Sequence, residues 1–275
     1  MIDTRHTRED PEGRDATLAA AAFGERPERW PLPTAATPAQ MWLRAVACGG
    51  QGRYGAAYRD LAALRRIGSG PLVSLAHSTQ GSFLRQLGWH TVARGWDGRA
   101  LALAGADPEA RADALIGLAA DALGVGRFPA AATLLARADP VRTAGPAPDR
   151  LPVRRGWRAA VRHATEAVRR AAVRHATEAV RLARAMVRPS ARHRVKSDVV
   201  LAAALCSAGD IERARAVAEA SLGDAGRLGL LPLRWALACL LIDIGSVTFQ
   251  PRKLLEIRDI CAGEIRHAGA TWRSA

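Results

Sequence analysis

The feature that most constrains the fold is a recurring glycine turn. A glycine is followed two residues later by a bulky or aromatic side chain, first at Gly52, Gly88, Gly126 and Gly209, and more weakly at Gly245. Each glycine is expected between two helices, where a positive φ or a close helix contact penalises a side chain. Small residues then fall at the expected helix crossings: Ala57, Ala93, Ala131 and Ala214. Because such hairpins cannot bury their apolar faces singly, the pattern predicts an all-α solenoid of about five to six stacked helical hairpins.

The composition agrees with a helical protein that does not enter a membrane. Only 5% of residues are aromatic, and alanine and arginine, both good helix formers, are abundant. The nearest approach to a membrane-spanning stretch, residues 228–244, is broken by Pro232 and Arg234. The alanine-rich patch at residues 19–23 is too short for a secretory signal. We therefore expect a cytoplasmic protein without membrane insertion.

Changes in composition predict the organisation of the chain. Residues 1–36 are rich in charge, proline and glycine and show no sustained periodicity, which is typical of a flexible tail. The helical pattern begins at residue 37 and continues to about residue 268. The predicted units are a tail over 1–36, a helical-repeat domain over 37–268 and a C-terminal tail over 269–275.

A duplicated segment lies inside the predicted repeat domain. RAAVRHATEAVR occupies residues 158–169 and recurs unchanged at 170–181, which indicates a recent duplication. The segment 158–181 forms either a hairpin with its turn near Ala167 or one helix from about 157 to 187. The long helix is favoured, because glycine and proline are absent between residues 156 and 189 and Glu166 can pair with Arg170. The duplicated His163 and His175 are expected to be solvated, since no acidic or cysteine ligand accompanies them at matched spacing.

The spacing of the hairpins resembles that of the tetratricopeptide repeat, in which a turn glycine precedes a small residue of the second helix by about five positions. The resemblance covers residues 37–268. The first three turn glycines are 36 and 38 residues apart, against about 34 in that repeat. The large aromatic residue expected early in each first helix is replaced by Met41, His77, Leu115 and Asp198. The resemblance implies a divergent, TPR-like adaptor or scaffold that binds other proteins.

In the family that the chain resembles, one side of each first helix lines a concave groove. The matching positions here are Leu75, Ser78, Ser82 and Arg85, then Trp42, Val46, Lys196, Val199 and Trp235. The polar residues of segment 75–90 form either a ligand surface or a hydrogen-bond network between helices. The basic run at 192–198 is expected to precede a helix that Asp198 caps. The predicted partner-binding residues are Trp42, Ser78, Ser82, Arg85, Arg194, Lys196 and Trp235.

The charge of the chain restricts the class of partner. The formal net charge is +14, and a positive field attracts acidic proteins and phosphates. An acidic protein or peptide is therefore the expected partner, with nucleic acid as the alternative. However, only Lys196 and Lys253 of the 40 basic residues are lysines, and such an arginine bias also follows from the codons of a GC-rich genome.

Motifs for catalysis, cofactors and metals are missing from the sequence. It contains no phosphate-binding GxxxxGK[ST] loop, no GxGxxG, no HExxH and no GxSxG. The four cysteines lie far apart without a CxxC pair, as expected of small buried hydrophobes. His77 and Ser78 are adjacent, so they cannot meet on a helix as a catalytic pair. The sequence therefore predicts a protein that is not an enzyme and needs no cofactor; it leaves the oligomeric state open.

Overall fold

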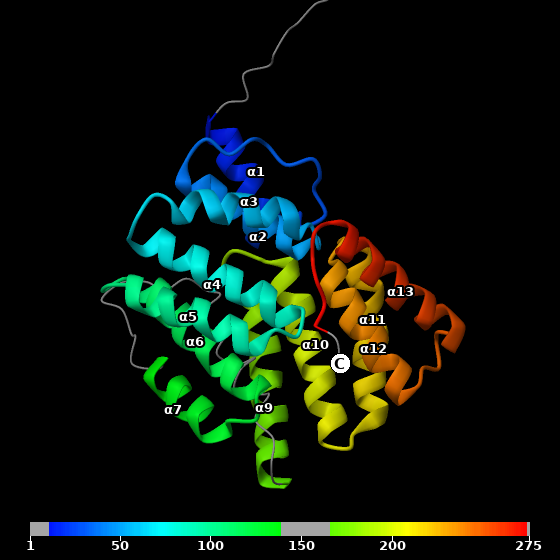
Figure 1. Cartoon of the computed structure of the whole chain (residues 1–275). Helices are drawn as coiled ribbons and strands as arrows, with labels where there is room; N and C mark the ends of the chain where they lie inside the picture. Colours follow the sequence, from blue (N-terminus) through cyan, green and yellow to red (C-terminus); the bar gives the residue numbers. More distant parts are fainter. Residues whose placement is uncertain (1–10, 139–165, 274–275) are drawn as a thin grey trace, which may run out of the picture.

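The computed structural model describes residues 11–138 and 166–273 and is all-α within those ranges (Figure 1). No helix in them is both long and apolar enough to span a membrane. The described helices are α1 (Pro11–Phe23), α2 (Pro38–Gly50), α3 (Tyr54–Arg65), α4 (Pro71–Gln86), α5 (His90–Leu103), α6 (Pro108–Gly124), α7 (Phe128–Ala138), α9 (Glu166–Arg184), α10 (Ala191–Ser207), α11 (Ile211–Arg227), α12 (Leu231–Ile244) and α13 (Pro251–His267).

Consecutive helices pack against each other in a solenoid-like arrangement, as the glycine pattern predicted. The hairpins are α2/α3, α4/α5, α6/α7, α10/α11 and α12/α13. The first helices α2, α4 and α6 contact one another in that order and form a row. Figure 1 shows α10 between these N-terminal hairpins and the C-terminal helices α11 to α13. The position of α10 determines where the candidate site lies.

The turn glycines adopt the conformation that the sequence predicted. Gly52, Gly88, Gly126, Gly209 and Gly245 have φ values of 77°, 88°, 75°, 82° and 76°, in the left-handed region. The small residues at the expected crossings are fully buried, with 0% exposure at Ala57, Ala93, Ala131 and Ala214. Close approach of the paired helices depends on these alanines. The predicted hairpin register is therefore confirmed.

Replacing Gly209 with alanine is expected to destabilise the protein by about 1–2 kcal/mol, because a side chain disfavours the left-handed backbone. A Cβ at Gly209 would meet nothing within 4 Å, so the loss comes from the backbone alone. Gly95, inside α5, also has open space around it but has no positive φ. Gly95→Ala is expected to stabilise the protein by about 0.5–1 kcal/mol. Urea unfolding measures the change in the free energy of unfolding in each variant. Changes of the same sign in the two variants would contradict the assignment of Gly209 to a turn.

The structure differs from the predicted N-terminal tail over residues 11–36. Helix α1 packs on α2 and buries Leu18, Ala21 and Ala22. The chain after α1 is also held, because Gln51 Nε2 donates to the backbone oxygens of Pro27 and Arg29 at 2.8 and 2.9 Å. The buried apolar residues of α1 extend along only about one turn of the helix, and charged residues flank them in the sequence. The segment therefore shows no sustained hydrophobic periodicity.

The second copy of the duplicated segment lies inside one helix, α9. Position 167 is helical, so a hairpin turn does not form there, and residues 158–165, with His163, lie outside the described residues. One face of α9 packs on α10 through Ala172, Ala176, Ala179 and Ala183. His175 lies on the exposed face, as expected.

Residues 268–273, here called the C-terminal strap, run back between the ends of the N-terminal hairpins and the C-terminal helices (Figure 1). Most of this segment was predicted to be a tail. The Gly55 N–H donates to the Ala268 oxygen at 2.7 Å, and the Arg273 N–H donates to the Leu87 oxygen at 3.0 Å. A Cβ on Gly269 would lie 3.0 Å from the Gly55 Cα, so this crossing requires glycine. The strap therefore joins the two ends of the stack.

Two tryptophans complete the attachment of the strap. Trp89 Nε1 donates to the Thr271 oxygen at 2.8 Å. Trp272 packs against Trp235 of α12 with ring centroids 4.4 Å apart. Such contacts link residues far apart in sequence, and a local pattern cannot reveal them.

Candidate functional site

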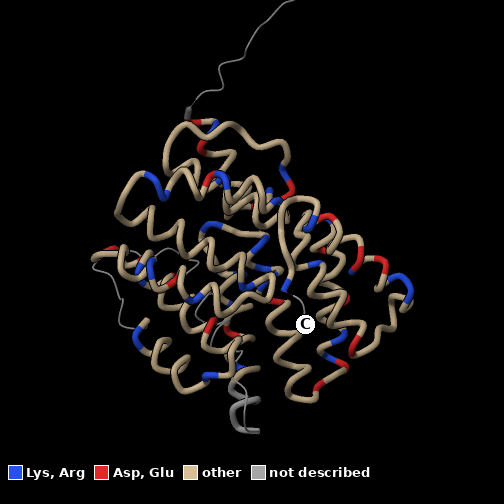
Figure 2. Tube along the Cα trace, viewed as in Figure 1, with Lys and Arg blue, Asp and Glu red and all other residues tan. Residues whose placement is uncertain are grey.

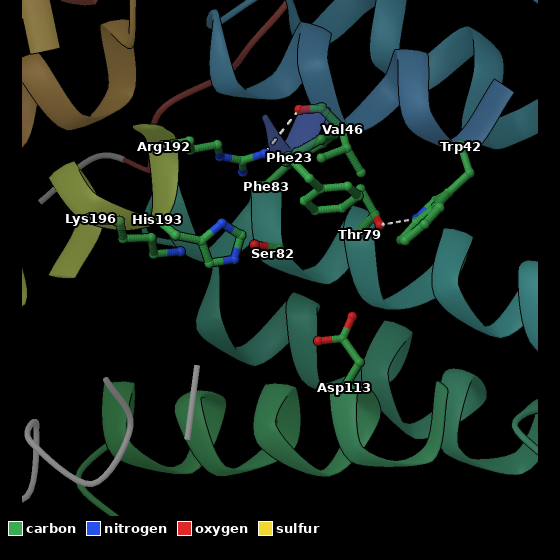
Figure 3. A pocket seen from close by; sticks show the side chains of 10 residues that line it. All are labelled: Phe23, Trp42, Val46, Thr79, Ser82, Phe83, Asp113, Arg192, His193 and Lys196. Atoms are coloured by element: carbon green, nitrogen blue, oxygen red, sulfur yellow. Dashed lines mark hydrogen bonds between the residues drawn. The ribbon is translucent and has the colours of Figure 1, made fainter. Parts of the chain in front are cut away.

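A pocket of about 50 Å³ lies where α10 meets the row of first helices (Figure 3). Five helices line it, so its shape depends on how α1, α2, α4 and α6 are placed against α10. The lining residues are Phe23 from α1, Trp42 and Val46 from α2, Thr79, Ser82 and Phe83 from α4, Asp113 from α6, and Arg192, His193 and Lys196 from α10.

The wall formed by α1, α2 and α4 is aromatic. The rings of Phe23 and Trp42 lie 5.4 Å apart, and Trp42 Nε1 donates to Thr79 Oγ1 at 3.1 Å. Phe83 packs directly on the backbone of α2, where a Cβ at Gly49 would overlap its ring. Because the indole N–H already has an acceptor, this wall presents mainly apolar surface to a ligand.

The wall formed by α10 is basic. Arg192 and Lys196 are four residues apart, which places them on one face of the helix. Arg192 Nη1 donates to the Val46 oxygen at 3.1 Å, and His193 Nδ1 shares a hydrogen bond of 2.8 Å with Ser190 Oγ. Figure 3 shows His193 and Lys196 projecting from α10 towards α4. The pocket thus offers cationic groups beside an aromatic wall.

One carboxylate, that of Asp113, enters the pocket from α6. The residue is only 3% exposed. A carboxylate accepts hydrogen bonds from N–H groups, whereas Arg192 and Lys196 donate them to oxygens. The lining of the pocket therefore combines N–H donors and one carboxylate with apolar surface.

The structure brings together three of the predicted partner-binding residues. Trp42, Ser82 and Lys196 all line the pocket, although α10 lies more than a hundred residues after α4. Two others, Ser78 and Arg85, are buried elsewhere. Ser78 is 2% exposed, and the side chain of Arg85 is 6% exposed.

Arg85 binds two carboxylates in the interior instead of lining a groove. Its Nη1 pairs with Asp97 of α5 and lies 3.1 Å from Asp121 Oδ1 of α6. Other polar residues of α4 also bond to neighbouring helices: Ser74 Oγ donates to the Ala100 oxygen at 2.6 Å. These contacts favour the hydrogen-bond network over the ligand surface for much of this helix.

Arg194 and Trp235 lie outside the pocket. Arg194 Nη1 forms an ion pair with Glu25 at 2.5 Å, and the strap residue Trp272 packs on Trp235. The sequence suggested that the basic run precedes a helix, and this prediction is wrong. The run lies inside α10, which begins at Ala191. Asp198 therefore lies inside α10, and Ser190 occupies the N-cap position. Serine is a residue type favoured at N-caps, so Ser190 was the signal for this earlier helix start, although its side chain makes no capping hydrogen bond.

The pocket also contains residues outside the predicted partner-binding set: Phe23, Thr79, Phe83, Asp113, Arg192 and His193. Phe23 lies in the segment predicted to be a tail, and the two residues from α10 lie in the basic run. The sequence around Asp113 gives no sign that this residue lines a pocket, because its place in the pocket depends on α10 lying opposite α6.

Comparison of the chain with protein families, curated proteins and solved structures gives no match. In the described part of the chain, no three His, Cys, Asp or Glu side chains are grouped so as to hold a metal ion. The chemistry of the site must therefore be inferred from the pocket itself.

Proposed function

We propose that the chain is a cytoplasmic, TPR-like adaptor, not an enzyme, which binds a peptide segment of a partner protein at the pocket between α10 and the first helices. The bound segment carries an acidic residue beside an apolar one. The observation that carries this proposal is the pairing of an aromatic wall with Arg192, His193 and Lys196 in one pocket.

The size of the pocket supports a peptide as the ligand. Small-molecule sites usually enclose about 300–1,000 Å³, whereas this pocket holds about 50 Å³. That volume suits part of one side chain and not a whole metabolite. A peptide can place one side chain in the pocket while the rest of it lies across α4 and α10. A carboxylate inserted there gains charge-assisted hydrogen bonds, which are stronger than neutral ones.

The distribution of charge favours an acidic peptide over nucleic acid. Figure 2 shows lysine and arginine spread over all the described hairpins, with acidic residues among them. A nucleic-acid surface would instead concentrate basic residues along one face or stripe. The arginine-rich composition therefore does not require a nucleic-acid ligand. The proposed role in peptide binding belongs to Arg192, His193 and Lys196 on α10 alone.

Selection of random peptides displayed on phage tests the proposal. We expect the wild-type chain to enrich peptides with an aspartate or glutamate next to an apolar residue. Lys196→Glu should lose that enrichment, since it reverses the charge at the pocket. Arg94→Glu makes the same change on the exposed face of α5 and should retain it. Enrichment of the same peptides by Lys196→Glu would count against the pocket.

A further inference from the structure

A second group of basic and aromatic side chains lies where α3, α4 and α5 meet. The guanidinium carbon of Arg65 lies 4.8 Å from the centre of the Trp96 ring, and that of Arg99 lies 5.6 Å from it. The His77 ring lies 5.4 Å from the same indole. We call these four residues the Trp96 cluster. Helical spacing places His77 on the side of α4 away from the pocket residues Thr79 and Ser82.

The cations of the Trp96 cluster are not neutralised by a carboxylate among the described residues. Arg65 donates one hydrogen bond, from Nη1 to Gln80 Oε1 at 3.3 Å, and Arg99 contacts the Trp96 ring. By contrast, Arg44 on α2 holds Asp60 through two bonds of 2.6 and 2.8 Å. The guanidinium groups of Arg65 and Arg99 therefore retain N–H donors for which the described residues supply no acceptor.

Burial, with the excess of positive charge as a second cause, lowers the pKa of His77 and of Arg65 in this cluster. Burial lowers the pKa of His77, and the charges of Arg65 and Arg99 lower it further. Burial lowers the pKa of Arg65 as well, and the neighbouring Arg66 adds to the effect. The imidazole of His77 is thus neutral at pH 7. Its Nδ1 is buried and has no hydrogen-bond partner among the described residues.

Two guanidinium groups beside one indole ring suit a dianion. The planar fork of arginine matches the oxygens of a phosphate group, and stacking on an aromatic ring orders the fork before a ligand arrives. A carboxylate would neutralise only one of the two charges, while a phosphate monoester carries close to two at pH 7. The site is also accessible, because Arg99 is exposed and Arg65, His77 and Trp96 are partly exposed.

We infer that the Trp96 cluster is a phosphate-binding site, with Arg65 and Arg99 as the anion ligands. His77 lies beside the bound phosphate, and Trp96 positions the two guanidinium groups. The site lies on another face of α4 from the pocket of the proposed function and does not depend on it.

Titration of the full chain with three probes tests this site by NMR of the His77 ring. The probes are inorganic phosphate, a short peptide containing phosphoserine, and the same peptide without phosphate. Chloride at equal ionic strength serves as the reference, since screening alone shifts histidine signals. Binding of phosphate is expected to raise the pKa of His77, because a nearby anion stabilises the imidazolium. Tighter binding of the phosphopeptide would identify a phosphorylated protein as the source, and equal binding would identify free phosphate.

Variants distinguish the site from general attraction to a basic protein. Arg65→Gln and Arg99→Gln should each weaken phosphate binding about tenfold, the effect of losing a charge-assisted bond. Arg94→Gln removes an exposed arginine from the same helix α5 and should leave binding unchanged. The inference is overturned if phosphate shifts His77 no more than chloride does, or if Arg94→Gln weakens binding as much as Arg99→Gln.

Discussion

Replacing Arg85 with leucine is expected to destabilise the protein by about 3–5 kcal/mol at pH 7, because it leaves buried carboxylates without their cation. The side chains of Asp97 and Asp121 are 0% and 1% exposed, so water cannot replace the guanidinium. Both carboxylates contact Nη1 of the one arginine. Each residue comes from a different helix, so the change weakens the packing of α4, α5 and α6 together.

The loss of stability in Arg85→Leu should become smaller as the pH falls. Burial raises the pKa of Asp97 well above its usual value, the nearby Asp121 raises it further, and Arg85 opposes both. Without Arg85 the pKa of Asp97 in the folded protein is higher still, while its pKa in the unfolded chain stays the same. A folded pKa above the unfolded one means that the folded state binds more protons, so acidification favours folding. Because the unfolded pKa is the same in both proteins, the difference in stability between them changes in the window between the folded pKa of Asp97 in the wild type and its higher folded pKa in Arg85→Leu.

Urea unfolding of Arg85→Leu at pH 7 and about pH 5 measures both effects. Arg181→Leu is the matched control, since Arg181 pairs with Glu178 on the exposed face of α9. Exposed ion pairs contribute little, so this variant should remain close to the wild type at both pH values. Equal losses in the two variants would show that the contacts of Arg85 are not a buried ion pair of structural importance.

Trp272→Ala is expected to release the strap and destabilise the protein by about 3 kcal/mol, the lower end of the range for removing a buried tryptophan. Trp272 is partly buried, packs on Trp235 at 4.4 Å and donates from Nε1 to the Ala262 oxygen at 3.4 Å. Its loss removes the main side-chain contact between the strap and α12. The backbone bonds of the strap to Gly55 and Leu87 should then open more often.

Hydrogen exchange at the amide of Gly55 gives the local readout, since that amide donates to the Ala268 oxygen. We expect faster exchange there in Trp272→Ala. Thr271→Ala should exchange like the wild type, because Trp89 bonds to the backbone oxygen of Thr271 and not to its side chain. Unchanged exchange at Gly55 in Trp272→Ala would contradict the role of the strap.

The features predicted correctly from the sequence are those that short segments determine. A glycine with positive φ or an alanine at a helix crossing is required locally, so Gly126 and Ala131 could be placed from the spacing alone. The same spacing placed Trp42, Ser82 and Lys196 on helices that meet in the pocket.

What the sequence could not supply depends on contacts between distant segments. The buried position of Arg85 follows from aspartates on two later helices, and an isolated arginine on an amphipathic helix resembles a surface residue. The positions of α1 and the strap depend on contacts with partners elsewhere in the chain. Asp113 joins the site only because α10 lies opposite α6.

A charge-swap experiment with one selected peptide tests the central claim, that the pocket binds an acidic peptide. Isothermal titration would compare the wild type, Lys196→Glu and Arg94→Glu with the peptide and with its acidic residue replaced by lysine. We expect Lys196→Glu to weaken binding of the acidic peptide at least about tenfold, the lysine peptide to restore binding to that variant, and Arg94→Glu to bind like the wild type. Equal weakening by both variants, or no rescue by the lysine peptide, would contradict the claim.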